Sequence, residues 1–508
     1  MAPTRKSSGA RAPSSRNLKR SAPYAAPQEN RATIEKKRKT AAKNTSTGKE
    51  QKRQKKTETS PVRIINTAPT QRLDVYVFGT NCDGELGLGD ATKKTEIPRP
   101  VLNPKLPAET VGVVTLAVGG VHSAALTHDN KILTWGVNDE GALGRDTQQD
   151  EEEIKLRDQE DSPDSDEEEE LVNLNLKEAT PSPVDPSCFP RDTVFTQVAA
   201  TDSATFALTT TGLVFGWGTF KGNSGEIGFS PNSKKQQRVP VLIPGLSNVT
   251  KLAAGSQHML ALTSKGAVLS WGCDEQHQLG RRRAHHNAPH PLVPGESALP
   301  SGMTNIGAGE YHSFAIHKSG AVYGWGSNNF GQTAIFTSAG QSDAVVVYPT
   351  KVKSLKQRPK IISINGGKDH SLAINEEGKC LSWGRIENKA LGHDLSNLPP
   401  SDVIFDERDR PRILKVPTVI SSISDKTVES LGLGTDHSFV ITKDGEAYSW
   451  GFNVQKQAGQ PGDTDEVVLP TLLSNKHVDG KKLVLASAGG QFSMVAGVHD
   501  AKVNGVKE

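Results

Sequence analysis

A repeat of short β-prone runs and glycine-rich corners recurs along this chain, and it constrains the possible fold more than any other feature. Residues 249–280 hold one full copy: an apolar run, a Gly-Ser-Gln-His corner, two further apolar runs joined by a turn, and a closing Gln-Leu-Gly. Such runs between turn residues predict β-strands, and no helical period of apolar residues fits them. Five other copies share this order: 113–144, 195–228, 303–333, 361–392 and 428–459.

The two ends of the chain complement each other. Residues 75–89 match the last part of a copy, and residues 483–497 match the first part. All six tryptophans precede a glycine at the same place in the repeat, at separations of 82, 54, 54, 58 and 67 residues. Periods of this size indicate a propeller or a solenoid. Six copies and two halves predict an all-β, seven-bladed β-propeller over residues 73–498, closed by N- and C-terminal strands that share one blade.

The first 72 residues differ from the rest in composition and charge. They carry 19 Lys or Arg against four Glu and almost no large apolar residues, while the whole chain has a net charge of only +3. Such a segment buries too little to offset the entropy of ordering, so we expect a disordered basic tail. Its paired basic clusters predict a nuclear-import signal and also suit DNA phosphate; a solvated tail without a partner is the alternative. The import residues are Lys19, Arg20, Lys36, Lys37, Arg38 and Lys39.

Two other segments fall outside the repeat. Residues 146–193 form an inter-blade insertion in which 150–170 contain 13 acidic and two basic residues, so we expect a disordered loop that is either solubilising or in contact with a basic partner. Residues 499–508 are expected to form a short C-terminal tail. The four cysteines show no metal or disulfide spacing. The sequence has no apolar run of about 18 residues, so we expect no membrane partner.

A histidine recurs in the Gly-x-x-His-Ser corner of five copies. Two interpretations fit this recurrence: metal ligands, and structural residues that bond the backbone of their own or the neighbouring blade. Copies of one position lie far apart around a ring, which favours the structural interpretation. With no nucleophile–base pair and no P-loop, the sequence predicts no metal site, no cofactor and no covalent catalysis. The five histidines are His122, His258, His312, His370 and His437.

The third copy departs from the repeat in two places. It reads Ala200-Thr201-Asp202-Ser203-Ala204 where the others have Gly-x-x-His-Ser, so a carboxylate replaces the usual corner chemistry. Its Trp-Gly is followed by a longer, Gly- and Asn-rich segment, 219–229, which we expect to project as a hairpin. The alternatives are a binding element and a harmless surface insertion.

The repeat, with its Gly-x-x-His-Ser corner, its Trp-Gly and its Gly-x-Leu-Gly end, resembles the regulator of chromosome condensation family over roughly residues 73–498. The basic tail, the seven blades without an appended domain and the wedge-like segment resemble the founding type, a nuclear guanine-nucleotide exchange factor for the small GTPase Ran. The resemblance implies nuclear, chromatin-associated exchange without covalent chemistry. It also implies three partners: Ran, the nucleosome with its histones and DNA, and a nuclear import receptor. A propeller adaptor, such as a ubiquitin-ligase scaffold, and a light receptor share the repeat and are the alternatives.

The resemblance also assigns residues. In the family the wedge presses on the GTPase and the opposite face of the propeller meets the nucleosome. Asp202 matches an aspartate implicated in exchange. The residues expected to contact the GTPase are Phe220, Lys221, Gly222, Asn223, Ser224, Gly225, Glu226, Gln257, Asp369, His370 and His437. The residues expected to bind chromatin are Arg281, Arg282 and Arg283. The alternative for these three residues is a solvated loop without a partner.

Overall fold

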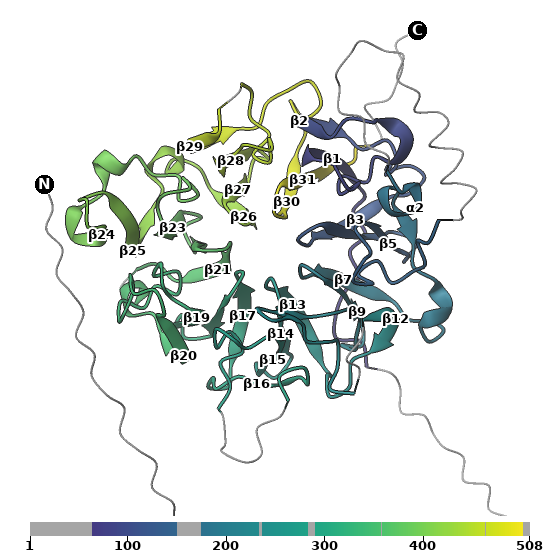
Figure 1. Cartoon of the computed structure of the whole chain (residues 1–508), viewed down its shortest axis with the longest axis horizontal. Helices are drawn as coiled ribbons and strands as arrows, with labels where there is room; N and C mark the ends of the chain where they lie inside the picture. Colours follow the sequence, from purple (N-terminus) through teal and green to yellow (C-terminus); the bar gives the residue numbers. More distant parts are fainter. Residues whose placement is uncertain are drawn as a thin grey trace, which may run out of the picture. The chain divides into compact units, whose positions relative to one another are not determined.

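Seven antiparallel sheets are arranged in a ring in the described part of the chain (Figure 1). The structure is a computed structural model that describes residues 63–149, 174–232, 236–282, 290–356, 358–462 and 464–500. It confirms the predicted all-β, seven-bladed propeller. Within these residues, no helix is long and apolar enough to cross a membrane.

Each blade has four or five strands, numbered here from the innermost outward. Blade 1 is β30 (Leu483–Ala488), β31 (Phe492–Val498), β1 (Leu73–Thr80) and β2 (Glu96–Leu102). Blade 2 is β3 (Val113–Val118), β4 (His122–Thr127), β5 (Ile132–Gly136) and β6 (Ser182–Pro183). Blade 3 is β7 (Phe195–Ala200), β8 (Ala204–Thr209), β9 (Val214–Gly218) and β12 (Gln237–Leu242). Blade 4 is β13 (Val249–Ala254), β14 (His258–Thr263), β15 (Val268–Gly272) and β16 (Gly295–Glu296).

The other three blades follow the same plan. Blade 5 is β17 (Met303–Ala308), β18 (His312–His317), β19 (Val322–Ser327) and β20 (Val345–Lys351). Blade 6 is β21 (Ile361–Gly366), β22 (His370–Asn375), β23 (Cys380–Arg385), β25 (Pro411–Val419) and β24 (Val403–Phe405). Blade 7 is β26 (Val428–Leu433), β27 (His437–Thr442), β28 (Ala447–Phe452) and β29 (Glu466–Leu472).

Blade 1 closes the ring with strands from both ends of the chain, as predicted. β31 pairs with β1 in a register that runs from Leu73 opposite Val498 to Gly79 opposite Phe492. The C-terminal end is held further by His499, whose Nδ1 lies 2.9 Å from Asp74 Oδ1. Because first and last blades share one sheet, the ring closes through β-ladder hydrogen bonds.

A three-part polar contact, here called the latch, joins most neighbouring blades. In the seam between blades 5 and 6, Trp383 Nε1–H and the Ser371 hydroxyl both donate to the carbonyl of Gln332, at 2.8 and 2.9 Å. His312 Nε2 lies 2.7 Å from the same hydroxyl oxygen. Because the hydroxyl proton goes to the carbonyl, the imidazole must donate through Nε2–H. The histidine and hydroxyl pairs of the five latches are His122–Thr205, His258–Ser313, His312–Ser371, His370–Ser438 and His437–Ser493. The last of them lacks the tryptophan, because blade 1 has Phe78 at that position.

The latch corrects one detail of the histidine prediction. Each corner histidine is structural, but its partner is a side-chain hydroxyl of the next blade and not a backbone group. Burial lowers the pKa of His312 to about 3 and that of His122 to about 4, so both rings are neutral at physiological pH. A neutral ring that donates one hydrogen bond fits a buried seam without an uncompensated charge.

The predicted boundaries differ from the structure at three places. The chain is docked on the propeller before residue 72: Ile65 and Asn66 N–H donate to Thr210 O at 2.8 and 3.0 Å. Residues 174–193 of the predicted insertion contain α2 (Leu176–Ala179) and β6, because blade 2 takes its outer strand from this segment. His499 belongs with the propeller. The import residues, the acidic stretch 150–170 and residues 501–508 lie outside the described residues.

Candidate functional site

The turns between the innermost and second strands of the blades surround one end of the central channel. The second residue of each turn forms a ring around this opening, here called the corner ring: Gly120, Asp202, Ser256, Glu310, Lys368, Thr435 and Gly490. Main-chain bonds link successive members, such as Asp202 N–H to Ser256 O at 2.8 Å and Ser256 N–H to Glu310 O at 3.2 Å. The ring therefore brings together side chains that are more than 50 residues apart in sequence.

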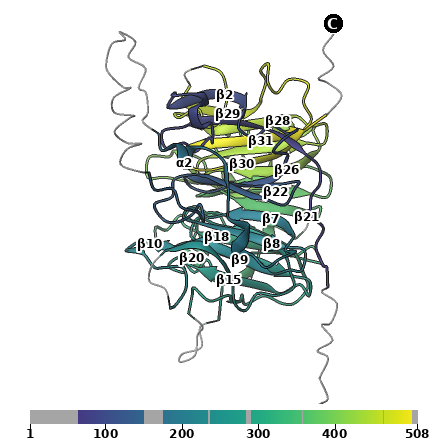
Figure 2. The ribbon, with the colours of Figure 1, turned by 90° about the vertical axis from the view of Figure 1, so that its right-hand side faces the viewer.

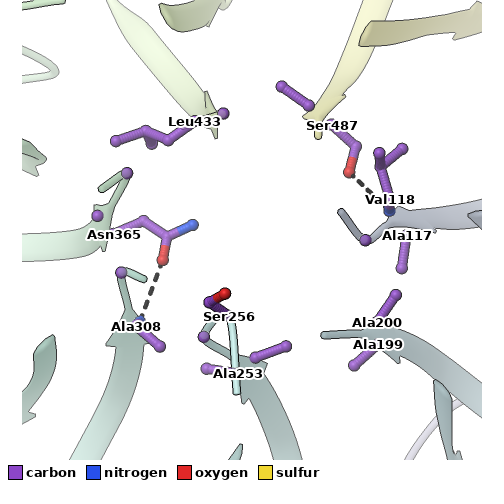
Figure 3. A pocket seen from close by; sticks show the side chains of 18 of the residues that line it. Ala117, Val118, Ala199, Ala200, Ala253, Ser256, Ala308, Asn365, Leu433 and Ser487 are labelled. Atoms are coloured by element: carbon purple, nitrogen blue, oxygen red, sulfur yellow. Dashed lines mark hydrogen bonds between the residues drawn. The ribbon is translucent and has the colours of Figure 1, made fainter. Parts of the chain in front are cut away.

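The channel below the corner ring has a volume of about 860 Å³ and is lined by the innermost strands. Figure 3 shows small side chains from successive blades facing it, among them Ala117, Ala199 and Ala253. Hydrogen bonds cross between neighbouring inner strands, including Val118 N–H to Ser487 Oγ at 3.2 Å (Figure 3). Small residues let seven inner strands approach the axis closely.

The structure corrects the alignment of the third copy by one residue. Ala204 pairs with Gly218 in β9 just as His122 pairs with Gly136 in β5. Ala204, not Ser203, therefore stands in the histidine position, and Asp202 occupies the corner ring. By the same alignment, Gln257 corresponds to Ser203 of blade 3, and Ser256 corresponds to Asp202.

Asp202 bridges blades 3 and 4. Its carboxylate accepts hydrogen bonds from the Ser256 hydroxyl and, at 3.5 Å, from Gln257 Nε2. Burial raises the pKa of Asp202, while these two hydrogen bonds and the charges of Lys221 and Lys368 act in the opposite direction. Asp202 therefore joins two blades and also places a carboxylate at the channel opening.

Glu310 and Lys368 belong to the same opening, and the sequence analysis missed both. Burial raises the pKa of Glu310 to about 7, with Lys368 opposing the shift and Asp202 adding to it. The Glu310 Oε2 atom is buried and has no hydrogen-bond partner among the described residues. The sequence signal was the second corner position, which the one-residue error in the third copy concealed.

The segment after β9 forms the expected hairpin, here called the wedge: β10 (Lys221–Gly222) pairs with β11 (Gly225–Glu226). Its tip, from Asn223 to Glu226, is exposed. In the side view of Figure 2, β10 lies at the margin of the propeller. A short hairpin of this kind is marginal alone, so contacts to neighbouring blades must hold it.

Blades 2 and 4 hold the base of the wedge. Lys221 N–H donates to Gln257 Oε1 at 2.7 Å, and Lys221 Nζ lies 2.5 Å from Glu140 Oε1. Asn223 N–H donates to Glu275 Oε2 at 2.8 Å. Because Gln257 also contacts Asp202, one chain of contacts links the wedge to the corner ring.

Five residues expected to contact the GTPase are buried: Gln257 and Asp369 are 8% exposed, and Phe220, His370 and His437 are 1% exposed or less, which corrects the assignment of these last three. Phe220 has 0% of its surface exposed and lies beneath the wedge. His370 and His437 are latch residues, with hydrogen bonds to Ser438 at 2.9 Å and Ser493 at 2.7 Å. A partner that meets the folded surface does not reach these side chains.

Asp369 lies next to the corner ring in blade 6. Its Oδ2 accepts from Arg385 Nη1 at 3.4 Å. Burial raises its pKa, while the charges of Arg385 and Lys368 oppose the shift. Asp202, Gln257, Asp369 and the wedge therefore share one end of the propeller.

The arginine loop is also divided by the structure. Arg281 is 8% exposed, and its guanidinium donates to Val293 O at 2.7 Å and to Ser270 Oγ at 3.3 Å. Arg145, one residue after the same Leu-Gly in blade 2, makes matching bonds to Thr134. Arg281 is thus a structural residue of the repeat, which corrects its assignment to chromatin. Arg282 is exposed, and Arg283 lies outside the described residues.

The far end of this loop returns beside the wedge. A hollow is lined by Glu226 and Ile227 of the wedge together with Glu275 and His290. The described end of the arginine loop therefore lies on the wedge side of blade 4, whereas the family resemblance implied a chromatin surface on the opposite face.

Comparison with known proteins shows the family to which the chain belongs. A family model described as the RCC1-like domain matches residues 74–495. Protein pim1 of Schizosaccharomyces pombe is 38% identical over 465 residues, which cover 88% of this chain and 81% of pim1. The guanine nucleotide exchange factor SRM1 of Saccharomyces cerevisiae is 35% identical over 436 residues, covering 84% of this chain and 88% of SRM1.

Solved structures agree. Prp20p from Saccharomyces cerevisiae, described with its binding properties to Gsp1p and histones, has a TM-score of 0.76 at 32% identity, covering 86% of this chain and 96% of Prp20p. Yeast RCC1 (Prp20) bound by Kap60 gives the same TM-score and identity, with 90% of this chain and 97% of that chain covered.

Proposed function

We propose, since this chain belongs to the RCC1-like domain family, that it is a guanine-nucleotide exchange factor for the small GTPase Ran. The observation that carries the proposal is the linked site at one end of the propeller. There, an exposed wedge is connected through Gln257 to Asp202 at the channel opening. The relatives named above include an exchange factor of similar length.

The mechanism requires differential binding and no covalent step. The wedge and the corner ring bind the nucleotide-free GTPase more tightly than the nucleotide-bound form. By linkage, the affinity of the GTPase for nucleotide falls by the same factor. Each difference of about 1.4 kcal/mol is tenfold in affinity, so a few contacts accelerate release greatly.

Roles follow from exposure. The wedge tip, with Asn223, Ser224, Gly225 and Glu226, contacts the GTPase together with the edge formed by Lys221 and Gly222. Asp202 and Asp369 supply negative charge at the opening. Phe220, Gln257, His370 and His437 act from beneath, by holding the contacting elements in place.

Chromatin binding and import are assigned to the basic parts of the chain. Arg282 is exposed on the blade 4 loop, and Arg283 follows it in sequence. The N-terminal tail supplies phosphate-binding charge and the signal for an import receptor. These assignments imply a nuclear, chromatin-associated protein, and they are supported by the binding properties described for Prp20p.

Release of a fluorescent guanine nucleotide from purified Ran tests the proposal. Catalytic amounts of the full chain are mixed with loaded Ran and excess unlabelled nucleotide. We expect acceleration of at least a hundredfold over the spontaneous rate, because contacts worth about 3 kcal/mol suffice for it. A rate equal to the spontaneous one would overturn the exchange function and leave an adaptor role.

A further inference from the structure

The seam between blades 3 and 4 lacks both halves of the latch. Ala204 stands where blade 2 has His122, and Met259 stands where blade 5 has Ser313. Both partners are replaced, so neither a histidine nor a hydroxyl is left unpaired by the loss of the other. Among the described seams, this is the one from which the wedge projects.

An aromatic cluster fills the seam between blades 3 and 4. The rings of Phe220 and Phe229 stack with centroids 6.2 Å apart and an interplanar angle of 12°, and Phe206 stacks against both at 6.0 and 6.1 Å. Trp271 of blade 4 meets Phe206 edge-on at 5.6 Å. Such pairs contribute beyond the area they bury and prefer fixed geometries.

Gly216 makes room for the cluster. It occupies the third-strand position held by Thr134 in blade 2 and Ser270 in blade 4. A Cβ atom at Gly216 would lie 2.6 Å from Phe206 Cδ1 and 3.1 Å from Phe229 Cζ. A side chain at this position therefore excludes the rings as they are packed.

The wedge contains the segment that other blades bury. Residues 226–228 of blade 3 correspond to Ala142-Leu143-Gly144 of blade 2, yet Ile227 is 37% exposed whereas Leu143 is 0% exposed. Trp325 Nε1–H donates to Gln278 O at 2.7 Å, but Trp271 Nε1 has no acceptor within the described residues. The carbonyl that would accept from Trp271 has moved outward with the hairpin.

The seam is held by other contacts. The Gln197 side chain bonds the backbone of Leu252 at 2.9 and 3.0 Å. Asn66 Nδ2 donates to Thr209 O of blade 3 and Val249 O of blade 4, at 2.9 and 2.8 Å. Closure at this seam therefore does not depend on the aromatic cluster alone.

We propose that Phe206, Phe229 and Trp271 are positioning residues that seat the wedge through Phe220. Repacking of this seam exchanged the polar latch for a rigid aromatic base under the hairpin. The inference rests on the proposed function for its consequence, because a pre-seated wedge loses less conformational freedom when it meets a GTPase. The seating itself is a property of the free protein.

The repeat provides a matched control. Phe314 occupies the position of Phe206 in blade 5, is also fully buried, and meets Trp383 edge-on with centroids 5.9 Å apart. The substitutions Phe206→Leu and Phe314→Leu remove the same ring from two seams. Only the first seam carries the wedge.

Hydrogen exchange and nucleotide release are measured on both variants of the full chain, well below their melting temperatures. For Phe206→Leu we expect about tenfold faster exchange of the wedge amides of Lys221, Asn223 and Ile227. We also expect nucleotide release from Ran to be about tenfold slower, because a misplacement of about 1 Å can cost up to about a hundredfold and the loosened wedge still samples its seated position. Phe314→Leu should leave the hydrogen exchange of the wedge and the rate of nucleotide release within about twofold of the original chain. A twofold change corresponds to less free energy than the ordering of one side chain.

The inference would be overturned if hydrogen exchange of the wedge amides is unchanged in Phe206→Leu, or if it is accelerated equally in Phe314→Leu. Where Phe206→Leu does not fold, Phe229→Leu replaces it with the same two outcomes. If the unsubstituted chain does not accelerate nucleotide release from Ran, the proposed function is overturned. Hydrogen exchange of the wedge amides in the free protein still tests whether the aromatic residues hold the wedge in place.

Discussion

At the scale of single residues, two carboxylates define the chemistry of the corner ring. Asp202 is bonded by Ser256 and Gln257, whereas the Oε2 atom of Glu310 has no partner among the described residues. The two groups lie at equivalent positions two blades apart, and the charge of Asp202 adds to the raised pKa of Glu310. Lys368 offsets part of this cost.

Substitution of Asp202 should affect both exchange and stability. Asp202→Ala removes the acceptor for the Ser256 hydroxyl, so we expect a loss of about 1–3 kcal/mol in the free energy of unfolding. Asp202→Asn keeps an acceptor and should restore most of the stability but not the rate of nucleotide release. Chemical unfolding and release assays on both variants check this; full release by Asp202→Asn would show that the charge is not used.

Glu310 should make stability depend on pH. Its pKa is raised to about 7 from 4.5, so the folded state holds a proton that the unfolded state has lost between these values. The contribution of Glu310 to the free energy of unfolding is therefore fully present below about pH 4.5, and it is lost as the pH rises through 7. Glu310→Gln should be more stable than the original chain by about 1–2 kcal/mol at pH 8, with little difference at pH 4.5. Melting curves at both pH values that differ by the same amount would contradict this assignment.

Sequence reasoning found Asp202 but not Glu310, for a physical reason. Asp202 stands out because its copy lacks the usual histidine. Glu310 sits in a normal copy, at a position where the residue differs between most copies of the repeat. Its significance arises only when the ring brings it near Asp202 and Lys368, which one linear repeat does not reveal.

At the scale of elements, the latch and the aromatic cluster beneath the wedge are alternative ways of filling a seam. Five seams have a buried histidine and a hydroxyl, and the seam between blades 3 and 4 has stacked rings. The hairpin was predictable from the length of its segment. The burial of Phe220 was not predictable, because the exposed tip and the buried anchor lie in one continuous segment and the sequence does not show where one ends and the other begins.

His437 and His312 test whether latch histidines act on the partner. Both are fully buried and bond a hydroxyl at 2.7 Å. His437→Ala and His312→Ala should each lower the free energy of unfolding by about 3 kcal/mol, because each leaves a cavity and removes the hydrogen bond that the buried hydroxyl oxygen accepts. Nucleotide release, measured below both melting temperatures, should be alike in the two variants. Selective loss of release in His437→Ala would restore a direct role for this residue.

At the scale of the whole molecule, both ends of the described chain help to close the ring. The seven blades and the shared closing sheet were predictable from the period and from the two half copies. The docking of residues 63–66 was not, since this short segment has neither the repeat nor a β-strand of its own. Asn66 nevertheless bonds two blades at the seam between blades 3 and 4.

Two deletions separate the tail from this docking segment. Removal of residues 1–62 should leave the melting temperature of the propeller unchanged. Removal of residues 1–67 also takes away Ile65 and Asn66, and it should cost about 1–2 kcal/mol from lost hydrogen bonds. Calorimetry on both shortened chains checks the difference; equal melting temperatures would show that the docking contacts contribute nothing.

The central claim is that the wedge displaces nucleotide from the GTPase. Stopped-flow release of a fluorescent guanine nucleotide from Ran is measured with the full chain and with a variant in which residues 221–225 are shortened to a tight turn. The account predicts release slowed by at least a hundredfold with a melting temperature nearly unchanged, because the exposed tip contributes contacts to the partner and few to the fold. Release at the original rate by the shortened variant would contradict it.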